Sequence, residues 1–318
     1  MTPGCSLWIL PHVARVYDLA MTHKLDADDF FIHRVQEACA RAGLNFFLIE
    51  PAWAEEYLAK LERKEVWARM VLNMQSEHHD PREVFHRIIR RSHELGAKVI
   101  DPPDVAMAAC HKAMAHQRLL AAGLQLPPTL ILDQNSAGQW PELTAEQLAL
   151  LAPPFVIKPA LGYGRKGIIL NATGIEDLKR AAEAWPWGPY LLQKRIVPRD
   201  LTGEPAYFRV YHVFGSTWLS WWNCYNDRYR LVTVQEEADL KLAPLHQIAR
   251  KLAEATGMNF FSTEVAQTES GEFFLIDYVN DQCHLLTQTA SPQNGVPDEL
   301  VNAIAVKLVE AASRWKTK

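Results

Sequence analysis

The chain has 318 residues, 48% hydrophobic and 22% charged, the balance of a globular protein long enough for two or three packed lobes. Its formal net charge of −4 indicates no general affinity for nucleic acid or for an anionic membrane. No apolar stretch approaches the roughly 20 residues that a membrane span needs, and Leu7–Leu10 is too short for a secretory leader. The cysteines form no CxxC pair, so we expect neither a zinc site nor disulfides, and a cytoplasmic location.

The first hundred residues alternate strand and helix patterns. Strands are expected at 6–10, 44–50, 66–74 and 97–101, and helices at 26–42, 53–63 and 81–95. Repeated strand–helix units are typical of a parallel sheet covered by helices. No strand in this region is followed by a Gly-rich phosphate loop. We therefore expect residues 1–104 to form a substrate-binding α/β lobe.

The rest of the chain begins at Pro102-Pro103, where Asp104 can cap a helix that runs to Ala122. Further helices are expected at 173–185, where Thr173 and Glu176 suggest a capping box, at 245–256 and at 297–315. Extended segments are expected at 124–132, 155–159, 168–170, 190–197, 206–223, 260–267 and 272–279.

A GxGxxG pattern is formed by Gly162, Gly164 and Gly167. A dinucleotide fingerprint places a helix directly after these glycines, whereas residues 168–170 continue a β pattern, so the loop joins two strands. A protein kinase has its ATP-binding Lys after the loop, with HRD and DFG motifs beyond it. Here Lys158 precedes the loop, and those motifs and the Walker A sequence are missing. What remains is a glycine-rich turn carrying Arg165 and Lys166, which can cover a triphosphate; a hairpin without a ligand is the alternative.

Two carboxylates are predicted to face each other late in the chain. If Ser270-Gly271 is a two-residue hairpin loop, Glu269 pairs with Glu272, and Glu264 lies opposite Asp277. One extra loop residue would instead place Glu264 opposite Ile276. Facing carboxylates destabilise a sheet unless a positive charge lies between them, and oxygen ligands are what Mg²⁺ prefers. Asn280 offers a third oxygen. Solvated carboxylates without a metal are the alternative.

A Lys-bearing strand, a glycine hairpin and a late carboxylate/Asn site, in this order, resemble the ATP-grasp superfamily. The likeness covers roughly residues 100–318, and the first lobe is similar to the domain that precedes it in glutathione synthetase-like members. The resemblance implies an N-terminal parallel α/β lobe (1–104), a first ATP-grasp subdomain with the glycine loop (105–195) and a second with the metal site (196–318).

The resemblance also implies a set of site residues. Lys112, Lys158 and the loop from Gly162 to Gly167 would contact phosphates, and Arg209 would contact the terminal phosphate. Gln193, Lys194 and Ile196 would surround adenine. Glu264, Asp277 and Asn280 would hold Mg²⁺, with Asp281 as a further candidate ligand. Lys194 stands where family members have an acidic residue, so Asp200 and Glu204 are candidates for the ribose contact.

The implied activity is an ATP- and Mg²⁺-dependent ligase that activates a small-molecule carboxylate as an acyl phosphate for attack by an amine. Arg209 and Lys158 would carry the catalysis by stabilising the transferred phosphoryl group. The alternatives are a small-molecule kinase on the same fold and a nucleotide-responsive binding protein without turnover. A substrate subsite could include Trp218, Trp221, Trp222, Asn223, Arg228 and Arg230, unless the tryptophans fill the core or a subunit interface, such as that of a homodimer.

Overall fold

The structure is a computed structural model that describes residues 14–23, 29–74, 80–162 and 164–316. Its first sheet, here the N-terminal sheet, is parallel with the strand order β2-β1-β3-β4. The strands are β1 (Arg15–Thr22), β2 (Phe46–Ile49), β3 (Val66–Asn73) and β4 (Lys98–Ile100), and the helices are α1 (Asp29–Arg41), η1 (Pro51–Trp53), α2 (Ala54–Glu62) and α3 (Val84–Glu94). The predicted parallel α/β arrangement is confirmed.

Strand β1 is the central strand that the sequence pattern did not predict. Its run Arg15–Thr22 carries Asp18 in the middle, which breaks the apolar pattern. The structure buries Asp18 and gives its carboxylate partners instead. The strand predicted at residues 6–10 lies outside the described residues.

The helix predicted from Asp104 to Ala122 is two helices, α4 (Pro103–Cys110) and α5 (Lys112–Ala121). His111 separates them in an extended conformation, with φ −76° and ψ 95°, and its Nδ1 accepts a hydrogen bond from Met114 N at 3.3 Å. The freed backbone N–H of Lys112 donates to Ala160 O at 2.7 Å. The prediction of one continuous helix was therefore wrong, and the break places Lys112 beside the end of β6.

A second sheet, here the small sheet, is antiparallel with the order β5-β8-β6-β7. It consists of β5 (Thr129–Leu132), β6 (Phe155–Pro159), β7 (Ile169–Ala172) and β8 (Tyr190–Gln193), packed with α6 (Ala145–Leu151) and α7 (Ile175–Ala184). The predicted capping box of α7 was wrong. Gly174 is the N-cap, and the Asp177 carboxylate accepts from the backbone N–H of Thr173 at 2.7 Å.

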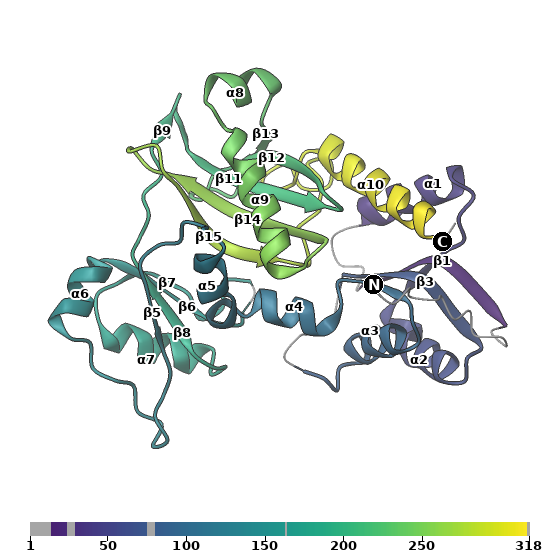
Figure 1. Ribbon diagram of the computed structural model, residues 1–318, viewed down its shortest axis with the longest axis horizontal. Coiled ribbons are helices and arrows are strands. Elements are labelled where there is room, and N and C mark those ends of the chain that lie inside the picture. Colours follow the sequence, from purple (N-terminus) through teal and green to yellow (C-terminus); the bar gives the residue numbers. More distant parts are fainter. Residues whose placement is uncertain (1–13, 24–28, 75–79, 163, 317–318) are drawn as a thin grey trace, which may run out of the picture.

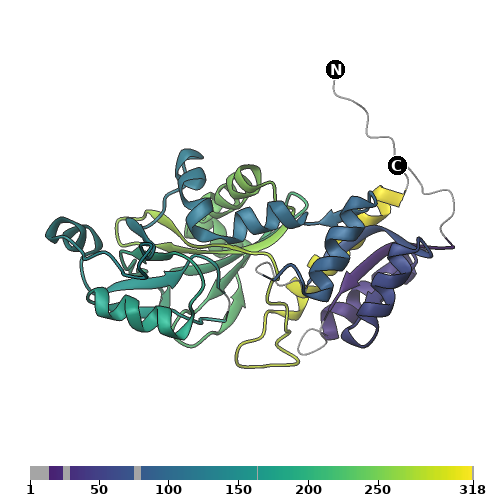
Figure 2. The ribbon, with the colours of Figure 1, turned by 90° about the horizontal axis from the view of Figure 1, so that it is seen from below.

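The third sheet, here the large sheet, is antiparallel with the order β13-β12-β11-β14-β15. Its strands are β11 (Tyr207–Val213), β12 (Ser216–Trp222), β13 (Tyr229–Leu231), β14 (Phe260–Gln267) and β15 (Phe273–Asn280). A separate short hairpin consists of β9 (Asp200–Leu201) and β10 (Glu204–Pro205). The helices of this part of the chain are α8 (Val234–Asp239), α9 (Ala243–Thr256) and α10 (Asp298–Lys316). The N-terminal sheet lies at one end of the molecule, and the large and small sheets lie side by side at the other (Figures 1 and 2).

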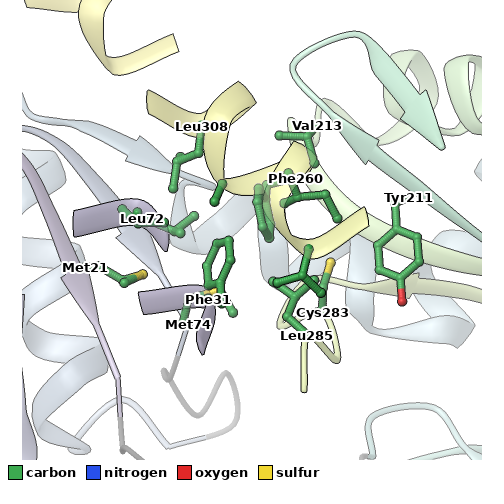
Figure 3. Close-up of a cluster of buried hydrophobic side chains, with 14 of the residues drawn as sticks. Met21, Phe31, Leu72, Met74, Tyr211, Val213, Phe260, Cys283, Leu285 and Leu308 are labelled. Carbon is green, nitrogen blue, oxygen red and sulfur yellow. The ribbon is translucent and has the colours of Figure 1, made fainter. Parts of the chain in front are cut away.

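The last helix, α10, returns to the N-terminal sheet and packs against α1 (Figure 1). One core cluster joins the two regions, and Figure 3 shows Phe31, Leu72 and Leu308 meeting Val213 and Phe260 of the large sheet. Because Leu308 is fully buried, truncating it to Ala should cost roughly 2–5 kcal/mol of stability. Among the described residues, no helix has the length and apolar character to span a bilayer.

Candidate active site

Three charged side chains form a row across adjacent strands of the large sheet. The sheet register pairs Arg209 of β11 with Glu264 of β14, and Glu264 with Asp277 of β15. Arg209 Nη2 lies 2.8 Å from Glu264 Oε1, and both side chains are buried. Antiparallel pairing therefore delivers one cation and two carboxylates to one face of the sheet.

The predicted opposition of Glu264 and Asp277 is confirmed, but the loop that was meant to produce it was wrong. Thr268 N donates to Glu272 O, and Gln267 pairs with Phe273, so the turn is one residue longer than predicted. The register shift between Val265 and Glu264 then restores the pairing of Glu264 with Asp277, and a second shift follows between Glu264 and Ser262. A β-bulge of this kind adds a residue on one strand and re-aims a side chain, here next to the charged row.

Two lysines from other elements reach the same carboxylate region. Lys112, the first residue of α5, places Nζ 3.3 Å from Asp277 Oδ1. Lys158 of β6 donates from Nζ to Ile276 O at 2.6 Å and lies over the ring of Tyr278, 5.5 Å from its centroid. The small sheet, α5 and the large sheet thus meet at the Asp277 segment of β15.

Neighbouring polar groups orient the charged row. Tyr207 OH donates to Glu264 Oε2 at 2.9 Å, and Arg209 lies over the ring of Trp222 at 4.8 Å. With its side-chain amide oriented to suit both neighbours, Asn280 donates to Asp277 Oδ2 at 3.3 Å and accepts from Arg209 Nη1 at 3.3 Å.

The electrostatics of this cluster favour an anionic ligand. Three cations (Lys112, Lys158 and Arg209) stand against two carboxylates (Glu264 and Asp277). Burial alone would raise the pKa of Asp277, but the three cations together lower it. Burial raises the pKa of Glu264 although Arg209 acts in the other direction. Burial also lowers the pKa of the Lys158 ammonium to about 8, with Asp277 opposing. Placing an anion beside the lysines would relieve this cost.

The glycine loop is a β-hairpin turn between β6 and β7, as predicted. A Cβ on Gly162 would lie 2.6 Å from Pro159 Cγ, and one on Gly167, whose φ is +69°, would lie 2.8 Å from Trp185 Cβ. Glycine is favoured at these two positions because the loop packs closely on Pro159 at Gly162 and on Trp185 at Gly167. Gly164 also has a left-handed φ, +60°.

The two cations of this loop have partners away from the charged row. Lys166 lies over the Trp185 ring at 5.4 Å, and Arg165 forms an ion pair with Asp227 in the turn between β12 and β13. The Arg165 pair therefore links the small sheet's hairpin to the large sheet.

The predicted adenine segment follows β8. Gln193 is buried and donates from Nε2 to Tyr278 OH at 3.1 Å, which connects it to β15. Lys194 is exposed, and its backbone N–H donates to Pro128 O. Ile196 is half-buried, against the core that includes Trp222. Asp200 is exposed and accepts from Gly203 N within the β9–β10 turn, so it shares no contact with the row.

No family model matches the chain. A probable alpha-L-glutamate ligase of Stenotrophomonas maltophilia is 32% identical over 85 residues, which are 26% of this chain and 27% of that relative. The match thus spans about a quarter of the length of the curated relative.

Solved structures match over almost the whole chain. The RimK domain ATP-grasp protein of Sphaerobacter thermophilus has a TM-score of 0.63 and 15% identity, over 92% of this chain and 98% of its own. The D-alanine–D-alanine ligase of Bacillus anthracis, complexed with ATP, has a TM-score of 0.62 and 12% identity, over 95% and 99%. The chain has the ATP-grasp fold. The ATP-grasp ligase PsnB, complexed with a minimal precursor, Mg and ADP, is similar at a TM-score of 0.61 and 15% identity, over 95% and 99%.

Within this ATP-grasp fold, the residues of the row suit a hard divalent cation. Asp277 Oδ1 is buried and accepts no hydrogen bond, although it lies 3.3 Å from Lys112 Nζ. The Asp277 side chain as a whole is 23% exposed. Glu264 and Asn280 supply further oxygens, the donor set that Mg²⁺ prefers. Within the described part of the chain, no group of three or more His, Cys, Asp and Glu side chains is placed to hold a metal ion.

The tryptophans of the predicted substrate subsite do not all lie in the same surroundings, since one is in the core and another is beside the charged row. Trp221 is buried against Phe208, which favours the core interpretation for that ring, whereas Trp222 lies under Arg209. Arg230 pairs with Glu236. The sequence interpretation missed Tyr207 and Tyr278. Tyr207 could have been found, because it lies two residues before Arg209 on β11 and therefore on the same face.

Proposed function

We propose that the chain is an ATP- and Mg²⁺-dependent ligase that joins a carboxylate to an amine through an acyl phosphate, forming an amide or peptide-like bond. The observation that carries this proposal is the meeting of Lys112, Lys158 and Arg209 with Glu264 and Asp277, from three parts of an ATP-grasp fold. Such a site suits a triphosphate, because cations and a metal together offset the charge on phosphoryl oxygens.

The charged residues of the site suit the two steps of an acyl-phosphate reaction. An oxygen of the substrate carboxylate attacks the γ-phosphorus, the bond to ADP breaks, and the amine then displaces phosphate from the acyl carbon. Lys158 and Lys112 would bind phosphate oxygens, and Arg209 would stabilise the transferred group. Glu264, Asp277 and Asn280 would hold Mg²⁺, which when bound offsets charge on the phosphates. No protein nucleophile is required for either step.

The comparisons suggest which substrates to test first. One partial relative is a probable alpha-L-glutamate ligase, and one neighbour was complexed with a precursor peptide. We therefore propose to test glutamate, other amino acids and short peptides first, both as the carboxylate substrate and as the amine substrate.

The test is phosphate release from Mg-ATP with paired acids and amines, followed by mass spectrometry of the products. The ligase proposal expects release that needs both an acid and an amine, and a product of their summed mass less water. A stable phosphorylated product would support a kinase instead. Tight ATP binding with no turnover across the panel would favour a binding protein. A variant that keeps full turnover after Asp277→Asn would remove the metal assignment.

A further inference from the structure

His284 lies on the segment that follows β15, a few residues beyond Asn280. Its neighbours Cys283 and Leu285 are buried in the core cluster of Figure 3, whereas His284 itself is half-buried. Tyr211 OH of β11 donates to His284 O at 3.3 Å. The core and the large sheet therefore hold the backbone around this imidazole in place.

The two ring nitrogens of His284 have different surroundings. Nε2 lies 3.1 Å from Asn294 O, and a carbonyl oxygen can only accept, so Nε2 carries the proton of the neutral ring. Nδ1 then holds a lone pair. No residue within 14–23, 29–74, 80–162 and 164–316 forms a hydrogen bond with Nδ1. The fold thus sets the tautomer of this imidazole and leaves Nδ1 able to accept a proton.

The ring of Tyr229 connects His284 to the charged row. It stacks with the His284 ring at 5.9 Å between centroids, and it lies 6.2 Å from the ring of Trp222, over which Arg209 lies. Burial raises the pKa of Tyr229 and the neighbouring Arg209 opposes this shift, so the phenol and the guanidinium are close. Since β13 and β12 lie on the outer side of β11, His284 is near the Arg209 end of the row. This is the end where the transferred phosphoryl group is proposed to bind.

We propose that His284 Nδ1 is the general base of the second step and accepts a proton from the amine that attacks the acyl phosphate. This rests on the proposed ligase function. The neutral amine forms the N–C bond, and its nitrogen passes one proton to Nδ1, which prevents the adduct from expelling the amine again. The bond between the acyl carbon and the phosphate oxygen then breaks, and its electron pair leaves with inorganic phosphate. The imidazolium returns its proton to water.

The test separates the two steps with hydroxylamine, a weakly basic nucleophile whose adduct loses its proton to water without a protein base. It uses the acid and the amine that the phosphate-release panel of glutamate, other amino acids and short peptides identifies. His284→Gln keeps an N–H near the Nε2 position for Asn294 O but has no basic nitrogen. In this variant, amide formation should fall by about 10²-fold, the contribution of a general base, while hydroxamate formation stays within about twofold of wild type.

His246→Gln is the matched control. It makes the same change to a half-buried imidazole that Thr217 and Glu237 hold, near the opposite end of β12 from Trp222. Neither rate should change in this variant. His284→Ala should lose amide formation as His284→Gln does, and added imidazole should restore part of it, because a small base can enter the space that the ring leaves.

The outcomes separate this inference from the proposed function. If no acid of the panel supports ATP-dependent phosphate release with either nucleophile, the ligase function fails and the inference falls with it. If the wild-type chain forms the amide and His284→Gln forms it equally fast, or loses hydroxamate formation to the same extent, the base role is overturned while the ligase proposal stands. Should circular dichroism show that His284→Gln does not fold, His284→Asn carries the same comparison, since it places a non-basic nitrogen near the Nδ1 position.

Discussion

Two aspartates in the two halves of the molecule, Asp18 and Asp277, have contrasting surroundings. Asp18, in the N-terminal sheet, accepts from Asn45 N at 2.9 Å and from Lys316 Nζ at 3.0 Å, and Arg69 adds a further cation. Asp277, in the large sheet, has a buried oxygen that accepts no hydrogen bond. Its side chain stays 23% exposed, against 6% for Asp18.

The difference teaches that burial of a carboxylate does not by itself mark a functional group. Asp18 Oδ2 accepts hydrogen bonds from Asn45 N and Lys316 Nζ, and its Oδ1 lies 3.5 Å from Arg69, so Asp18 stabilises the packing of β1 against the last helix. Asp277 keeps capacity for a ligand while three cations lower its pKa. A polar group with an oxygen that can still accept a hydrogen bond therefore points to the candidate active site. Each of the following predictions changes a residue in one of the two regions.

The largest effect is expected from Asp277→Asn. Loss of the carboxylate that is proposed to hold Mg²⁺ should lower kcat by roughly 10²–10³-fold. Circular dichroism should show a folded chain, because the shape of the side chain is kept. Glu272→Gln, on the exposed end of the same hairpin, is the matched control and should keep its activity. Equal losses in both variants would contradict the assignment.

The next effect concerns pH. The phosphate-binding role proposed for Lys158 needs its ammonium form, whose pKa burial lowers to about 8. Above that pH, kcat/KM for ATP should fall toward about tenfold per pH unit.

The free energy of unfolding should rise with pH in the range where kcat/KM falls. The folded pKa of Lys158 lies below its ordinary value of 10.5, so between about 8 and 10.5 the unfolded chain binds more protons. This group therefore adds to stability as the pH rises through that window. Lys158→Met should flatten both profiles, and an unchanged alkaline limb of kcat/KM would refute the role of Lys158.

Tyr207→Phe should give a smaller loss. It removes the hydrogen bond to Glu264 Oε2, and partners of metal-binding carboxylates are worth about 10-fold to 100-fold in metal affinity. We expect the Mg²⁺ concentration for half-maximal activity to rise by about tenfold. Tyr211→Phe makes the same change two residues along the same face of β11, where the hydroxyl donates to His284 O. That variant should leave the Mg²⁺ requirement unchanged.

Asp18→Asn should have the smallest catalytic effect and a clear effect on stability. It removes the charge that faces Lys316 and Arg69, and should cost about 1–3 kcal/mol of unfolding free energy. Chemical denaturation measures this loss, and kcat for any established substrate pair should stay close to the wild-type value. A large loss of kcat with unchanged stability would reverse the contrast between the two aspartates.

Much of the fold could be predicted, because periodicity and glycine positions report local structure directly. The parallel N-terminal sheet and the glycine hairpin are examples. Strand β1 was missed because Asp18 looks like a surface residue until Lys316, almost 300 positions away, is seen beside it. The break at His111 was missed because its cause, a bond from Lys112 N to Ala160 O, is also long-range.

Prediction of the candidate site from sequence is limited by long-range contacts in the same way. The opposition of Glu264 and Asp277 was predicted from a turn of the wrong length, and a register shift between Val265 and Glu264 produced the right pair. The ligand roles of the site residues stay predictions, since they depend on molecules that bind there. The position of Tyr278 could not be predicted from sequence, because its hydroxyl joins Gln193 of β8 to His116 of α5, two residues from separate elements.

The packing of α10 on the N-terminal sheet also has a consequence for biosynthesis. A ribosome makes strands β1 to β4 first, yet Leu300, Ile304 and Leu308 complete the core that one face of their sheet requires. While the intervening residues are being translated, that face has no permanent cover. The nascent lobe should therefore rely on chaperones until the last helix emerges, even though its strands are contiguous near the start of the chain.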